Sequence, residues 1–158
     1  MTKKLNLGCN DLKLDGFINI DIDPRVKPDM LANCLHLPFE DDSVDEIYAG
    51  HLLEHTTPEE EALKEWHRVL KKGGKITITV PDVEKAIFLY KSNELGLDMV
   101  NQVVFGANDR EQQNHHQVFT RMILVDQMSK YFRTTIVDDS PHAYFKVNWQ
   151  TIAEGYKV

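Results

Sequence analysis

The first residues that could do chemistry are a glycine and a carboxylate, each following a short apolar stretch. Gly8 lies in residues 5–10, and residues 17–24 end with Asp21 and Asp23. A glycine turn lets the backbone approach a ligand closely, and an acid at the tip of the next strand can accept hydrogen bonds from two ribose hydroxyls. This pairing indicates a nucleotide-type pocket. Alone it also fits an ordinary turn beside an acidic loop, because dinucleotide-binding turns carry three glycines and this turn carries only one.

The elements that would position these residues alternate along the chain. Apolar stretches predict strands at residues 4–7, 17–21, 30–32, 44–49, 75–80, 134–138 and 149–156. Helical spacing and capping residues predict helices from Pro58 to the glycines at residues 73–74, at residues 83–91 and 95–105, and from Thr120 to about 132. Such alternation indicates an α/β fold with a mostly parallel sheet, and the short last link requires an antiparallel final strand.

The helix after Thr57 has the clearest boundaries. Thr57 is expected to be its N-cap, with Pro58 in the first position and Glu60 completing a capping box. Two glycines, at residues 73–74, are expected to stop it. Asp82 is more typical of a helix cap than of a catalyst, so we expect it to begin the next helix.

Several strands alternate apolar and polar side chains, which indicates one dry face and one polar face. The clearest case is residues 75–80, where Ile76, Ile78 and Val80 alternate with Lys75, Thr77 and Thr79. No helix fits before Thr57, and the segment between Gly8 and Asp21 is too short for a crossover helix. We therefore expect the N-terminal crossover helices to be missing, and the polar face to be left to water or to a second copy in a homodimer.

Composition narrows the classes of protein. A chain of 158 residues suits a single domain, residues 1–158. Its net charge of −7 disfavours nucleic-acid binding, which needs clustered Lys and Arg. No apolar run suits a membrane span and no signal-peptide pattern opens the chain, so we expect no membrane partner. Cys9 and Cys34 lack zinc-site or CxxC spacing and are typical of free thiols in a reducing compartment, which predicts a cytoplasmic protein.

Four segments resemble motifs of the class I S-adenosylmethionine (SAM)-dependent methyltransferases and follow one another in the same order. They are residues 7–10, 33–39, 50–55 and 70–74. The chain looks most like the compact bacterial members that are often linked with surface-polysaccharide genes. This resemblance implies a Rossmann-like methyltransferase sheet, with SAM as the cofactor and S-adenosylhomocysteine (SAH) as its product. Each segment would lie at the carboxyl end of a strand, where open α/β sheets bind ligands.

The resemblance also implies roles for individual residues. The glycine turn would hold the methionine part of SAM, Asp21 the ribose, and Asn33 the adenine amino group. The implied cofactor-binding residues are Leu7, Gly8, Cys9, Asn10, Asp21, Ile22, Asn33, Cys34, Leu35 and His51. Two positions depart from the family pattern. Asn10 replaces a glycine, although asparagine tolerates left-handed geometry, and Asn33 replaces an acid but keeps an oxygen that can accept from the amino group.

Methyl transfer from a sulfonium is an in-line displacement, so the protein must align the acceptor with the methyl group. A hydroxyl acceptor also needs a base, and histidine suits that role near neutral pH. His51 follows the fourth strand, where it would be either a methyl-proximal residue or a pocket wall. The family often carries a histidine-bearing loop over the substrate, where this chain has His115 and His116. We therefore expect His51, His115 and His116 to line the methyl-transfer site.

We expect no metal, because the adjacent His115 and His116 point apart and the spacing places no third ligand. His55 fits a structural hydrogen bond better than catalysis. Two functions stay open. The first is an enzyme that methylates a small-molecule acceptor, with sugar hydroxyls favoured by the resemblance. The second is a non-catalytic SAM-binding or partner subunit, favoured by the reduced glycine turn and the missing helices.

Overall fold

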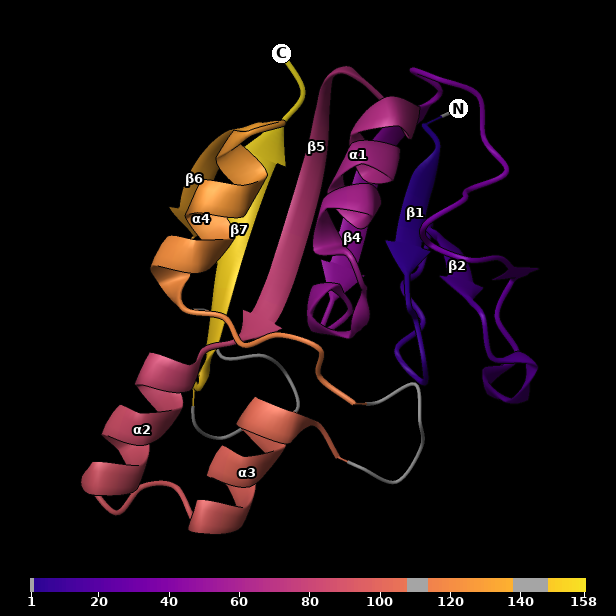
Figure 1. Ribbon diagram of the computed structural model, residues 1–158. Helices are drawn as coiled ribbons and strands as arrows, with labels where there is room; N and C mark the ends of the chain where they lie inside the picture. Colours follow the sequence, from indigo (N-terminus) through magenta and orange to yellow (C-terminus); the bar gives the residue numbers. More distant parts are fainter. Residues whose placement is uncertain (1, 108–113, 138–147) are drawn as a thin grey trace.

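The computed structural model describes residues 2–107, 114–137 and 148–158 (Figure 1). Seven strands form one sheet in the order β3-β2-β1-β4-β5-β7-β6. The strands are β1 (Lys4–Leu7), β2 (Ile18–Asp21), β3 (Met30–Leu31), β4 (Val44–Gly50), β5 (Leu70–Pro81), β6 (Arg133–Val137) and β7 (Gln150–Tyr156). The expected link through residues 140–141 lies outside the described residues.

The sheet is parallel except at one strand. β1 pairs in parallel with β2 and β4, and β5 extends this sheet in parallel from β4. β7 runs antiparallel to both β5 and β6. This confirms the Rossmann-like methyltransferase sheet with an antiparallel final strand. Because the strand order reverses at β1, the carboxyl ends of β1, β2 and β4 flank the place where such sheets bind ligands.

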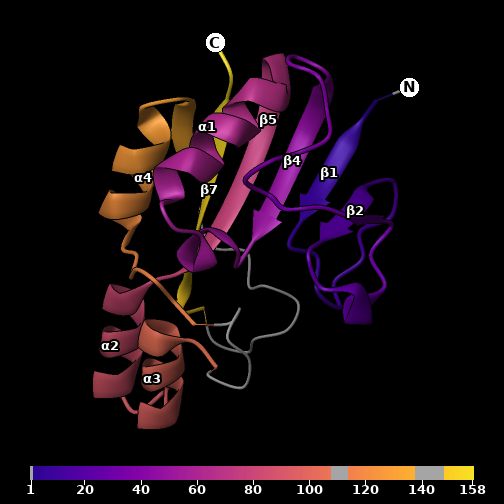
Figure 2. The same ribbon diagram turned by 45° about the vertical axis from the view of Figure 1, so that its right-hand side comes forward.

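The helices cover one side of the sheet and one end of it. α1 (Glu59–Val69) and α4 (Arg121–Ser129) lie on the same side, whereas α2 (Val83–Lys91) and α3 (Leu97–Phe105) lie together beyond the carboxyl end of β5 (Figures 1 and 2). Between residues 2 and 58 the only helical segments are two short 3-10 helices, η1 (Pro24–Val26) and η2 (Leu53–His55). The prediction that the N-terminal crossover helices are missing is therefore confirmed.

The core lies between α1, α4 and the sheet. Leu63 and Trp66 of α1 are buried in the same cluster as Ile76, Ile78 and Val80 of β5, so the predicted dry face is confirmed. Trp66 also donates a hydrogen bond from Nε1 to the Cys34 carbonyl oxygen at 3.0 Å. This bond ties the helix to the loop that follows β3.

Both ends of α1 differ from the prediction. Pro58 has an extended backbone and is itself the N-cap, and no side chain caps the helix, so the capping box of Thr57 and Glu60 is wrong. The helix ends at Val69, ahead of the two glycines. Leu70 is buried and pairs with Val44 of β4, so strand pairing takes over the segment that was expected to continue the helix.

The polar face is less open than expected. Thr79 is buried, and Lys75 and Thr77 are only half-exposed, so the prediction of a solvated face is wrong at Thr79. The Tyr48 ring lies against Gly50, which pairs with Thr79 in the sheet, and it shields this end of the face.

The rest of the polar face carries paired charges. Lys4 Nζ lies 2.6 Å from Glu46 Oε2, and Lys75 Nζ lies 2.6 Å from Glu154 Oε1. Among the described residues, no helix covers this side of the sheet (Figure 2).

Candidate cofactor and acceptor site

The turn after β1 is shaped by two left-handed residues, Gly8 with φ 60° and Asn10 with φ 40°. A Cβ atom at Gly8 would stand 2.7 Å from Leu52 Cδ1, so the turn leaves no room for a side chain there. Asn10 adopts the left-handed geometry expected of it, because asparagine pays a smaller steric penalty there than most residues. The turn therefore brings bare backbone to the end of the sheet.

Asp21 closes the opposite side of this turn. Its Oδ2 accepts from the Asn10 backbone N–H at 2.9 Å, and its Oδ1 accepts from the Asp23 N–H at 2.9 Å. An ionised carboxylate has about four lone-pair sites, so each oxygen keeps capacity for a hydroxyl donor. These bonds fix the carboxylate and still allow it to hold a ribose.

A cavity of about 170 Å³ opens beside Asp21. Seven of the ten predicted cofactor-binding residues line it: Gly8, Asn10, Asp21, Ile22, Asn33, Cys34 and His51. The Ile22 side chain is 61% exposed, so the cavity offers an apolar surface next to the carboxylate, which suits an aromatic base beside a ribose. We call this the cofactor cavity.

A second cavity of about 250 Å³ shares Gly8, Asn10 and His51 with the first and is also lined by Cys9. The Cys9 thiol is buried, which raises its pKa, and Lys13 Nζ lies 3.0 Å from its sulfur. A protonated thiol at this place is a packing group, not a nucleophile.

Two predicted cofactor residues line neither cavity. Leu7 is fully buried in the core, and Leu35 packs against the core without lining either cavity. Asn33 Oδ1 accepts from the Leu35 N–H at 2.9 Å, which leaves it one lone pair for a ligand. Burial raises the pKa of the adjacent Cys34 thiol to about 11.

A third cavity, of about 330 Å³, lies between the end of β5, α3 and the loop after β4. It shares Asn10, His51 and His55 with the cofactor cavity, and Met99, Gln102 and Trp149 form part of its wall. We call it the acceptor cavity because a molecule bound in it would lie next to a molecule bound in the cofactor cavity.

His51 stands between these cavities in left-handed geometry, with φ 50°. Its Nε2 lies 2.7 Å from Gln150 Oε1, and its Nδ1 lies 3.5 Å from Glu54 Oε1. Burial acts to lower the pKa of His51, but the hydrogen bond and charge of Glu54, with a further contribution from Gln150, raise it overall. The ring is held from both sides at the boundary of the cofactor cavity.

The other histidines are placed differently from one another. His115 and His55 both line the acceptor cavity, and burial lowers the pKa of His115. His116 is exposed, lines none of the three cavities, and donates its backbone N–H to the Glu54 carbonyl oxygen at 2.9 Å. The structure thus brings His51 and His115 to one cavity and leaves the His116 side chain outside it.

Sequence reasoning missed Glu54 as a site residue. Its carboxylate is buried and lies near the rings of His51 and His55. The sequence places it beside His55, but its burial depends on the segment around His115, which comes from much later in the chain. Gln150, the first residue of the antiparallel strand β7, and Trp149, directly before it, were also missed as site residues.

Comparison with known proteins finds similarity to methyltransferases. A family model described as a methyltransferase domain matches residues 16–78. Over 94 residues, 54% of this chain, the sequence is 33% identical to the methyltransferase GfsG of Streptomyces halstedii. Over 65 residues, 37% of this chain, it is 34% identical to the demethylmenaquinone methyltransferase of Alkalihalophilus pseudofirmus. The chain spans 34% and 28% of the length of these two relatives.

Solved structures share the fold over the whole chain. One is a SAM-dependent methyltransferase of Thermotoga maritima, described as a possible histamine N-methyltransferase, which is 19% identical to this chain with a TM-score of 0.68. The match covers 100% of this chain and 83% of the Thermotoga chain. A SAM-dependent methyltransferase of Methanosarcina mazei is 18% identical with a TM-score of 0.67 and covers 99% and 92%. The fold is that of the Rossmann-like, class I SAM-dependent methyltransferases.

Proposed function

We propose that this protein is an enzyme that transfers a methyl group from SAM to a small-molecule acceptor. The observation that carries the proposal is the position of His51, which lines both the cofactor cavity and the acceptor cavity. A methyl group must pass directly from one bound molecule to the other, so the two spaces have to meet at one wall.

The cofactor cavity fits SAM in three parts. Asp21 accepts from the ribose hydroxyls, Ile22 and Asn33 take the adenine, and the bare backbone at Gly8 receives the methionine part. When bound, SAM supplies a methyl group on a sulfonium that needs no further activation as a leaving group. The chain's own residues therefore have to bind SAM and the acceptor and orient them toward each other. For a hydroxyl acceptor they also have to remove a proton.

We assign His51 and His115 to the acceptor side. His51 is held between Glu54 and Gln150, which fixes its ring at the cavity boundary, and His115 is fixed by a bond from Nδ1 to the Val103 carbonyl oxygen at 2.9 Å. Rings fixed in this way can align an acceptor, and either can take a proton near neutral pH. His116 remains a proposed substrate contact from the same loop, with an exposed side chain.

A sugar hydroxyl is our proposed acceptor, in keeping with the resemblance to compact bacterial methyltransferases associated with polysaccharide genes. The free thiols at Cys9 and Cys34 support a reducing compartment such as the cytoplasm. Within the described parts of the chain, no helix combines the length and apolar character needed to cross a membrane.

The alternative function is a subunit that binds SAM without turnover, and the absence of an α-helix before α1 in the described residues favours it. Methyl-labelled SAM offered with a panel of sugars and sugar nucleotides separates the two. We expect labelled product from the wild type, and His51→Ala and His115→Ala to lose turnover by more than their loss of SAM affinity. Normal SAM binding with no labelled product across the panel would favour the binding subunit.

A further inference from the structure

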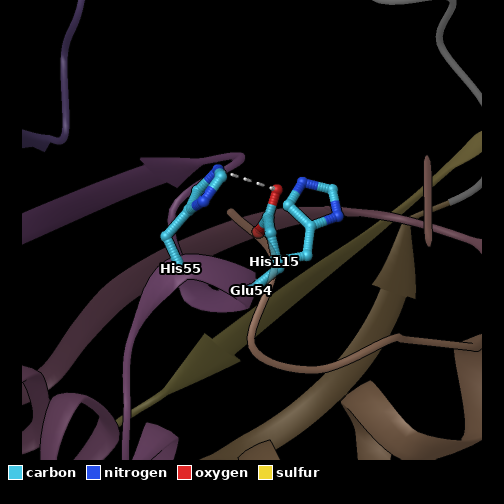
Figure 3. A group of neighbouring side chains, drawn as sticks. All are labelled: Glu54, His55 and His115. Carbon is cyan, nitrogen blue, oxygen red and sulfur yellow. Dashed lines mark ion pairs between the residues drawn. The ribbon is translucent and has the colours of Figure 1, made fainter. Parts of the chain in front are cut away.

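Glu54, His55 and His115 meet at the wall of the acceptor cavity although they come from two distant segments of the chain. Glu54 and His55 lie in η2, and His115 lies just before α4. The Glu54 carboxylate stands between the two imidazole rings (Figure 3). One ligand atom from each residue falls within 4.8 Å of the others.

The Glu54 carboxylate is 1% exposed, and among the described residues neither oxygen has a partner close enough for a good hydrogen bond. The nearest histidine nitrogens among the described residues are His51 Nδ1 and His55 Nε2, at 3.5 Å and 4.0 Å from Oε1, and both distances exceed that of a good charge-assisted hydrogen bond. A buried carboxylate is costly unless it is paired or coordinates a metal. Within the parts of the chain that the structure describes, Glu54 therefore has no positive group closer than His51.

Both histidines are arranged as metal ligands. His55 Nδ1 lies 3.1 Å from the Asn114 carbonyl oxygen, and His115 Nδ1 lies 2.9 Å from that of Val103. Because a carbonyl only accepts, Nδ1 is the donor in each contact, and in a neutral imidazole this places the lone pair on Nε2. A backbone carbonyl on the second ring nitrogen is the usual way in which a metal-ligating histidine is oriented.

We propose that Glu54, His55 and His115 bind a divalent transition-metal ion of the Zn²⁺ class. Two imidazoles and one carboxylate are the ligands of a known type of catalytic zinc site, which keeps a further position open. A tetrahedral ion about 2.0–2.1 Å from each ligand needs them roughly 3.3 Å apart, so small side-chain rotations would close the site. All three residues line the acceptor cavity, so an ion held by them would lie at its wall.

The proposal also narrows the acceptor, and this step rests on the proposed methyl transfer. An ion at this wall would bind an acceptor through an oxygen or nitrogen lone pair and hold it beside His51. With the ion bound, His115 would be a ligand and His51 would be the remaining histidine base, because both ring nitrogens of His115 would be engaged. A hydrocarbon carbon acceptor has no such atom, so the site favours hydroxyl or nitrogen acceptors.

Titration of metal-stripped, untagged protein with Co²⁺ and with Zn²⁺ tests the site without any need for SAM or an acceptor. We expect one ion per chain and a visible Co²⁺ spectrum of low coordination number, with no thiolate charge-transfer band from Cys9 or Cys34. The isosteric Glu54→Gln should weaken binding at least tenfold, as should His115→Ala, because each loses one of only three protein ligands.

His116→Ala is the matched control, since it removes an adjacent histidine whose side chain is exposed. It should bind the ion as tightly as the wild type. The proposal is overturned if the wild type takes up no stoichiometric ion, if the spectrum shows thiolate ligation, or if the control loses as much affinity as the two ligand variants. Circular dichroism of each variant separates lost ligation from lost folding, and the wild-type stoichiometry decides the matter if a variant is unfolded. SAM titration of the same samples reports on the proposed function independently.

Discussion

Asp21 is the residue on which cofactor binding should depend most. Asp21→Asn keeps the size of the side chain and an oxygen to accept from the Asp23 N–H, but removes the charge and the acceptor that faces the Asn10 N–H. Each charge-assisted hydrogen bond to ribose contributes roughly 1.5–3 kcal/mol. We expect SAM affinity, measured by calorimetry, to fall at least tenfold with the unfolding temperature little changed. Unchanged affinity would remove Asp21 from the ribose site and leave Asp23 as the candidate.

The thiol of Cys34 should be unreactive at neutral pH, because burial raises its pKa to about 11. The thiolate is the reactive form, and its fraction falls about tenfold for each pH unit below the pKa. Alkylation of Cys34 by iodoacetamide, followed by mass spectrometry, should be slow at pH 7.5 and accelerate as the pH rises towards 11. Protein unfolded in denaturant provides the reference rate, and folded protein that reacts at that rate at pH 7.5 would contradict the assignment.

At the residue scale the sequence was informative where type and spacing alone define a role. Gly8 follows β1 and Asp21 ends β2. Because these two strands are neighbours in the sheet, the proximity of Gly8 and Asp21 could be predicted. Glu54 is different, because its burial results from the approach of the segment around His115. Contacts between distant segments depend on packing, and no local pattern encodes them.

At the scale of elements, α1 links the core to the cofactor cavity through Trp66, whose Nε1 bonds to the Cys34 carbonyl. Trp66→Phe leaves that carbonyl without its donor and should lower the free energy of unfolding by about 1–3 kcal/mol, measured by urea denaturation. Lys64→Ala on the same helix is the control, because its ion pair with Glu60 is exposed and contributes little. Equal effects of the two variants would show that the bond does not support the fold.

Strands were predicted better than helix ends for a physical reason. Alternation reports directly which face of a strand is buried, and the dry face of β5 follows it. The end of α1 is set by competition between helix propagation and pairing of Leu70 with Val44, which lies far away in the sequence. Local signals such as the glycines at residues 73–74 cannot report that competition.

At the scale of the molecule, the sheet face opposite α1 and α4 carries ion pairs and has no helix over it among the described residues. We propose that a second copy of the chain covers this face. Sedimentation should give the mass of two chains, and Lys75→Glu should shift it towards one by placing like charge beside Glu154. Lys64→Glu, on the helical side, should leave the dimer intact. A wild type that sediments as one chain at all concentrations would contradict the dimer.

Binding of SAM and SAH to the wild-type protein, measured by isothermal calorimetry, tests the central claim most directly. The account predicts that both bind with one molecule per chain, because one cofactor cavity with Asp21 and Gly8 at its wall serves both. It also predicts that SAH, the product, binds at least as tightly as SAM, as suits an enzyme that turns over. If neither molecule binds, both methyl transfer and the non-catalytic SAM-binding alternative are contradicted.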